Sequence, residues 1–83
     1  MSPDEIFQVI KRQALEILPH IEDAQFTIDK SLQELGANSI DRADVVVQVM
    51  EALNLRIPLI EFGEVKNLRA LTEVFYRKLN EKK

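Results

Sequence analysis

Apolar residues recur every three or four positions in three separate stretches of this chain, which is the spacing of helices that each bury one face. The first stretch follows Ser2, with Pro3 next to it and Glu5 three positions further on. This arrangement is typical of a capping box with proline at the first helical position. Because Pro19 disfavours a helical conformation at Leu18, the pattern predicts a first helix from about Pro3 to Leu18.

The second stretch begins beside a good helix cap, Asn38, and predicts a helix from Asn38 or Ser39 to about Leu53, where Asn54 can close it. A helical wheel separates a polar face from an apolar face. The polar face consists of Asp41, Asp44, Gln48 and Glu51. The face that we expect to point to the core consists of Val46, Val49, Met50 and Leu53.

The third stretch starts after Asn67, another good helix cap, and predicts a last helix. Its apolar stripe consists of Leu68, Leu71, Val74, Phe75 and Leu79. Before it, Pro58 interrupts any regular helix. Residues 59–65 can form one short helix that Gly63 weakens. The pattern leaves open which apolar residues of this segment face the core: Leu59, Ile60 or Phe62.

The connection between the first two helices, residues 20–38, is long for a loop, and its spaced apolar residues predict that it packs on the core. Ser31 and Glu34 have capping-box spacing and predict a single helical turn. Together these patterns predict an all-α fold, a small helical bundle of three main helices and one short helix. We expect it to form a single domain of residues 1–83.

The composition argues against several classes of protein. The 83 residues include no cysteine and one histidine, so no metal or redox site is expected. His20 is expected to be an exposed loop residue, which leaves no base for nucleophilic catalysis. A net charge of -3 argues against nucleic-acid binding, and apolar runs such as Val45–Val47 are too short to cross a membrane. We therefore expect a cytoplasmic protein that is not an enzyme.

Residues 34–41, Glu-Leu-Gly-Ala-Asn-Ser-Ile-Asp, carry the most specific signal. This string resembles the phosphopantetheine attachment motif of acyl carrier proteins, in which Leu-Gly precedes a serine at a helix start and an aspartate follows two residues later. The order of helices is similar to that family from about Ile6 to Leu79. The resemblance implies a 4'-phosphopantetheine attached covalently to Ser39. The position suits that group, because the first-turn amides of a helix favour an anion.

Departures from the common motif imply a subtype. Asn38 stands where most family members have aspartate, and Arg42 adds positive charge beside Ser39. The net charge of -3 is also mild for a fatty-acid carrier. Residues 38–44 resemble discrete donor carriers of β-branching cassettes in polyketide biosynthesis, which hand an acyl unit to a synthase resembling 3-hydroxy-3-methylglutaryl-CoA (HMG-CoA) synthase. The resemblance implies acetyl as the acyl group.

The implied partners are a phosphopantetheinyl transferase and acyltransferase or ketosynthase-type enzymes, as well as the HMG-CoA-synthase-like enzyme, and we expect a monomer. Two alternatives stay open. The chain can be an unmodified helical protein–protein interaction module, in which Ser39 only caps a helix, or a fatty-acid-type carrier. A helix-turn-helix DNA binder is disfavoured because the acidic face of the second helix would repel phosphate.

Partner recognition is expected on the second helix, where Ile40 and Val47 fall beside the acidic face and should be at least partly exposed. Apolar anchors rimmed by charge are typical of binding hot spots. The residues predicted to take part are Ile40, Asp41, Arg42, Asp44, Val47 and Glu51.

Overall fold

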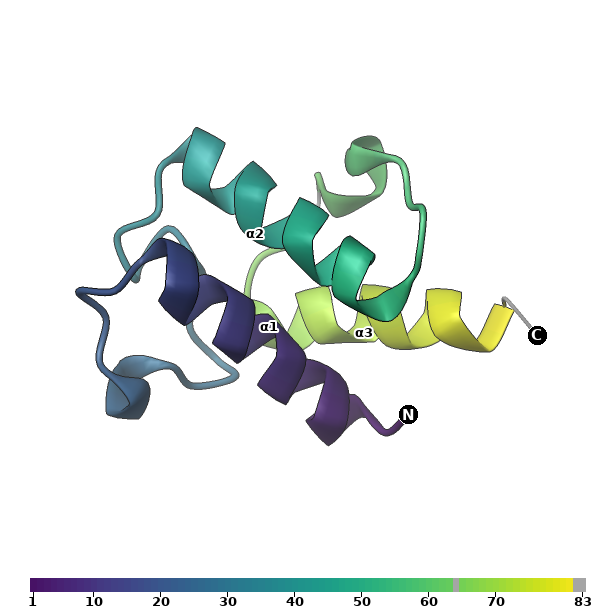
Figure 1. Ribbon diagram of the computed structural model, residues 1–83, viewed down its shortest axis with the longest axis horizontal. Coiled ribbons are helices and arrows are strands. Elements are labelled where there is room, and N and C mark those ends of the chain that lie inside the picture. The colour runs from purple at the N-terminus through teal and green to yellow at the C-terminus, as the bar shows by residue number, and fades with distance from the viewer. Residues whose placement is uncertain (64, 82–83) are drawn as a thin grey trace.

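The computed structural model describes residues 1–63 and 65–81, and in this part of the chain all regular structure is helical (Figure 1). The elements are α1 (Pro3–Ile17), η1 (Asp23–Gln25), α2 (Ser39–Leu53), η2 (Leu59–Phe62) and α3 (Leu68–Glu81). The two η elements are short 3-10 helices. The Cα radius of gyration is 11.6 Å. The predicted all-α bundle of three main helices is confirmed.

The predicted capping box at the start of α1 is present. The backbone N–H of Glu5 donates to Ser2 Oγ at 3.2 Å, and the backbone N–H of Ser2 donates to Glu5 Oε1 at 3.0 Å. The hydrogen bond from the Ser2 backbone lowers the pKa of the Glu5 carboxyl. The helix ends at Ile17, one residue earlier than predicted, and Leu18 caps it.

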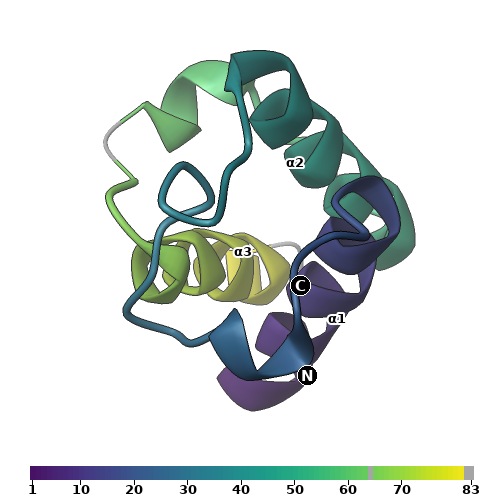
Figure 2. The same ribbon diagram turned by 90° about the vertical axis from the view of Figure 1, so that its left-hand side faces the viewer.

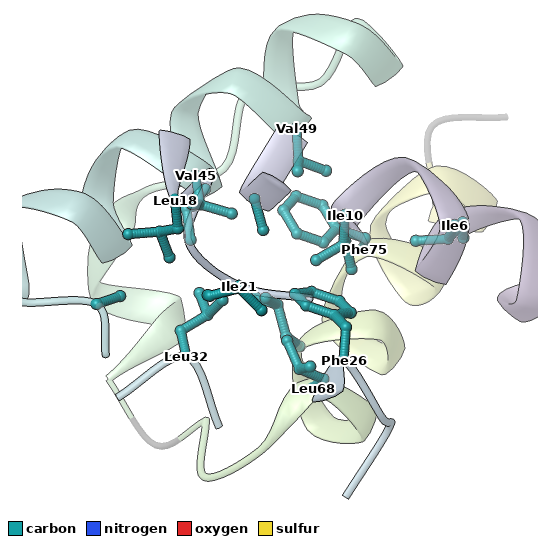
Figure 3. Packing of buried hydrophobic residues seen from close by; sticks show 14 of the residues in the cluster. Ile6, Ile10, Leu18, Ile21, Phe26, Leu32, Val45, Val49, Leu68 and Phe75 are labelled. Carbon is teal, nitrogen blue, oxygen red and sulfur yellow. The ribbon is translucent and has the colours of Figure 1, made fainter. Parts of the chain in front are cut away.

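The core lies where α1 packs against both α2 and α3 (Figure 1). Figure 3 shows side chains from all three helices and from the long connection meeting there. Residues that are essentially inaccessible to solvent include Ile6, Ile10, Val45, Val49, Leu68 and Phe75. Thr72 is also buried, and its hydroxyl donates to the Leu68 carbonyl at 2.8 Å, so this buried polar group is satisfied.

The buried face of α2 differs in part from the predicted one. Val46 and Val49 are buried as expected, but Met50 and Leu53 are only half-buried at the edge of the core. Val45, which the wheel did not place in the core, is inaccessible. The difference arises because α1 packs on α2, which centres the buried arc on Val45 and Val49.

The connection from α1 to α2 passes beside the start of α3 (Figure 2) and is hydrogen-bonded to it. The backbone N–H groups of Leu68 and Arg69 donate to the carbonyls of Lys30 and Ile28, at 2.8 and 2.9 Å. Arg69 Nη2 also lies 2.9 Å from Asp29 Oδ1. The prediction that this connection packs on the core is therefore confirmed, and its buried apolar residues are Ile21, Phe26, Leu32 and Ala37.

The single helical turn predicted at Ser31–Glu34 forms: the backbone N–H of Leu35 donates to the Ser31 carbonyl at 3.2 Å, and the capping hydrogen bonds are present. The backbone N–H of Glu34 donates to Ser31 Oγ at 3.0 Å, and that of Ser31 donates to Glu34 Oε1 at 3.1 Å. The turn does not extend into a longer helix, and residues 32–36 are turns. The chain leaves the helical path because Gly36 adopts φ +101°, a left-handed conformation.

The short helix η2 ends at Phe62, earlier than the predicted range 59–65. Phe62 packs against Phe75 with ring centroids 5.3 Å apart, whereas Leu59 and Ile60 are 52% and 86% exposed. Phe62 is thus the residue of this segment that faces the core. Lys78 Nζ lies 2.9 Å from Glu61 Oε1, which gives η2 a second attachment to α3.

Candidate functional site

Ser39 is the first residue of α2, and its side chain is exposed. Asn38 caps the helix as predicted: its Oδ1 accepts a hydrogen bond from the backbone N–H of Asp41 at 2.8 Å. The backbone N–H of Arg42 donates to the Asn38 carbonyl at 2.9 Å. The hydroxyl of Ser39 is therefore presented to solvent from a well-defined helix start.

The turn before α2 determines where Ser39 lies. The backbone N–H of Ala37 donates to the Leu32 carbonyl at 3.0 Å, and the Ala37 side chain is buried. A Cβ placed on Gly36 would lie 3.3 Å from Nε2 of His20. Both the left-handed conformation and this close approach favour glycine at position 36. His20 itself is exposed, as predicted.

A surface cavity of about 510 Å³ opens beside Ser39. Its walls are the first turns of α2, the helix η2, the segment that leads into α3, and the turn near Leu32; Figure 2 shows these elements around one end of the bundle. Apolar lining comes from residues such as Val46 and Phe62, and positive charge comes from Arg42 and Lys66. Sequence reasoning missed this cavity because its walls come from segments that are far apart in the chain.

Of the six predicted recognition residues, Arg42 lines this cavity and the other five do not. Ile40 and Val47 are 71% and 38% exposed, so the predicted exposure of both is confirmed. Asp44, Val47 and Glu51 line a shallow hollow on the surface. Asp41 is half-buried in the first turn of the helix. These positions combine apolar and acidic side chains in one accessible strip.

Arg42 stands apart from that strip. Two residues correspond to about 200° of rotation about a helix axis, so Arg42 projects away from Asp44. It is exposed, and together with Ser39 it lines the cavity.

The site fits a group attached through a phosphodiester. An exposed serine hydroxyl at a helix start can take the phosphoryl group, and the first-turn amides and Arg42 supply positive potential there. A modifying enzyme would supply the base, so Ser39 needs exposure and no activating neighbour. Within residues 1–63 and 65–81 no group of acidic or histidine side chains could hold a metal ion, and no helix is long and apolar enough to span a membrane.

Comparisons with known proteins agree with this site. The phosphopantetheine attachment site family matches residues 8–75. The polyketide biosynthesis acyl-carrier-protein AcpK of Bacillus subtilis is 42% identical over 79 residues, covering 95% of this chain and 96% of that protein. An acyl carrier protein of Guillardia theta is 29% identical over 80 residues, covering 95% of this chain and 98% of that protein.

A solved structure is similar along nearly the whole chain. It comes from the crystal structure of the curacin biosynthetic pathway HMG synthase in complex with an acetyl-donor acyl carrier protein. The matched chain is 38% identical, with a TM-score of 0.87, and the match covers 94% of this chain and 100% of that chain.

The helix order and an exposed serine at a helix start fit the class of proteins that carry a covalently bound arm. The family match and the 42% identical relative show which one: the chain belongs to the acyl carrier protein family. Its prosthetic group is a covalently attached 4'-phosphopantetheine, which holds acyl groups as thioesters. Proteins of this family are carriers of the acyl group.

Proposed function

We propose that this carrier serves polyketide biosynthesis as an acetyl donor, that Ser39 carries its phosphopantetheine arm, and that it delivers acetyl to an HMG-CoA-synthase-like enzyme. The observation that carries this proposal is the match, with a TM-score of 0.87, to a chain solved in a complex of an HMG synthase with an acetyl-donor carrier. The match covers all of that chain, and the 42% identical AcpK is also described as a polyketide biosynthesis acyl carrier protein.

The position of Ser39 supports its role as the attachment residue. It lies at the start of α2 with its hydroxyl exposed, where a phosphopantetheinyl transferase can reach it. The other two serines are Ser2 and Ser31, whose hydroxyl oxygens both accept capping hydrogen bonds.

We further propose that the partner enzyme docks on the strip of α2 that borders Ser39. Ile40 is 71% exposed and directly follows the attachment residue, so it can enter an apolar socket on the partner. Asp44 and Glu51 add negative charge beside Val47, which favours a partner with basic residues at these points. Asp41 and Arg42 complete the predicted recognition set close to Ser39.

Arg42 supports selectivity within that set. It places positive charge next to the attachment residue, and like-charge contacts penalise a partner that presents a basic patch there.

Further parts of the proposal are that the chain works as a monomer and single domain in the cytoplasm, that a phosphopantetheinyl transferase modifies it, and that it catalyses no reaction itself.

The test compares two acceptors for the same acyl group. The holo protein is loaded with acetyl and offered to an HMG-CoA-synthase-like enzyme and to a fatty-acid elongation ketosynthase, and transfer to each is followed by mass spectrometry. Preferential transfer to the synthase supports the proposal, and Arg42→Glu should reduce the preference. Efficient acetyl transfer to the ketosynthase, with no transfer to the synthase, would show that the chain is an extension or fatty-acid-type carrier.

A further inference from the structure

Arg42 has a charge that its own helix does not neutralise. The neighbours of a helical residue lie three and four positions away. For Arg42 these are Asn38, Ser39, Val45 and Val46, none of which carries a carboxylate. Among the described residues no ion pair involves its guanidinium, and the side chain is exposed.

The direction of a helical side chain brings this charge toward Ser39. Cα–Cβ bonds in an α-helix tilt toward its N-terminus, and long side chains cover the turn before their own Cα. The turn that precedes Arg42 is the first turn of α2, which Ser39 begins. Because both residues line the same cavity, they share one side of the helix.

The described lining of the cavity is positively charged in a chain whose net charge is -3. The charged residues among its described lining are Arg42 and Lys66, both cations. Glu64, between Gly63 and Val65, lies outside the described residues. An anion attached to Ser39 would thus meet positive potential from Arg42, from Lys66 across the cavity and from the first-turn amides of α2.

We propose that Arg42 is a positioning residue that pairs, within the same chain, with the phosphodiester attached to Ser39. The inference rests on the proposed attachment at Ser39. A guanidinium presents donors in a fork that matches the oxygens of a phosphate, whereas the Asp41 carboxylate in the same turn repels them. The pairing holds the base of the arm on the cavity side of α2, away from the strip that contains Asp44 and Glu51.

The test uses holo protein whose single modification has been verified by intact mass, so that a failure of attachment is seen before the pairing is measured. The ³¹P resonance of the phosphodiester is recorded for the wild type, Arg42→Gln and Arg77→Gln, at about 0.01 M and about 1 M salt, where the Debye length is about 30 Å and 3 Å. Arg77 is also exposed, but it lies in the second half of α3 and serves as a matched control.

The expected result at low salt is a shifted ³¹P resonance in Arg42→Gln and an unshifted one in Arg77→Gln, with the difference lost at high salt because exposed ion pairs are screened. The Nε resonance of Arg42 in the wild type should also move when the apo form is converted to the holo form. If Arg42→Gln superposes on the wild type at both salt concentrations and the Arg42 resonance does not move, Arg42 does not hold the phosphodiester.

Discussion

The side chain of Asn38 accepts a hydrogen bond of 2.8 Å from the backbone N–H of Asp41, so the residue before Ser39 closes the first turn of α2 from outside. Most members of this family have aspartate at the position of Asn38. The amide keeps the acceptor oxygen that the cap requires and omits the negative charge. The helix start can therefore be well formed without a further anion beside the group attached to Ser39.

Replacing Asn38 tests this relationship. Asn38→Ala should lower the free energy of unfolding by about 1 kcal/mol, because one first-turn N–H loses its partner, whereas Asn38→Asp should keep most of the stability. Urea denaturation followed by circular dichroism measures both. Equal stability of Asn38→Ala and the wild type would show that the hydrogen bond to Asp41 contributes nothing to the start of α2.

Alanine substitutions of an exposed and a buried isoleucine distinguish a role in docking from a role in folding. Ile40→Ala should change the free energy of unfolding by less than about 0.5 kcal/mol, because Ile40 is 71% exposed. Ile10→Ala should cost about 2–5 kcal/mol, because Ile10 is fully buried. In acetyl transfer to the synthase, Ile40→Ala should lower kcat/KM at least about fivefold, the effect of losing an interface anchor worth more than about 1 kcal/mol.

The result for Ile40 has two informative failures. A loss of stability in Ile40→Ala comparable to that in Ile10→Ala would make Ile40 a structural residue. Unchanged stability with unchanged transfer would remove Ile40 from the docking surface.

The ion pair between Lys78 and Glu61 predicts a pH dependence. Its hydrogen bond raises the pKa of Lys78 above its ordinary value of 10.5. A raised pKa in the folded state stabilises the fold fully below 10.5, and this contribution is lost as the pH rises through the folded-state pKa. Wild type should therefore be more stable than Lys78→Met at about pH 8, and the difference should shrink at about pH 11.5.

Urea denaturation at both pH values measures this difference, with Arg77→Met as the matched loss of an exposed cation on α3. If the free energies of unfolding of wild type and Lys78→Met differ by the same amount at both pH values, the ion pair does not stabilise the packing of η2 on α3.

Features that depend on neighbouring residues were predictable from the sequence. A cap and the groups it satisfies lie within about four residues, so Ser2, Asn38 and Asn67 marked the starts of the three helices. The attachment motif is equally local, because its serine follows a glycine turn and precedes a helix. The predicted bounds of α1 and α2 were accordingly correct to within one residue.

Features that depend on distant residues were not predictable in this way. The burial of Val45 depends on where α1 crosses α2, and a helical wheel contains no information on the neighbour. The burial of Phe62 in place of Leu59 or Ile60 depends on its contact with Phe75. The cavity and its positive charge combine Arg42 with Lys66, which are brought together by the fold.

The most direct test is the intact mass of the purified chain after incubation with coenzyme A and a broad-specificity phosphopantetheinyl transferase. The wild type should gain the mass of one phosphopantetheinyl group, and Ser39→Ala should gain nothing. Ser2→Ala and Ser31→Ala, which remove the other serine hydroxyls, should be modified like the wild type. A gain that persists in Ser39→Ala, or no gain in the wild type with any transferase, would contradict the assignment of Ser39 as the attachment residue.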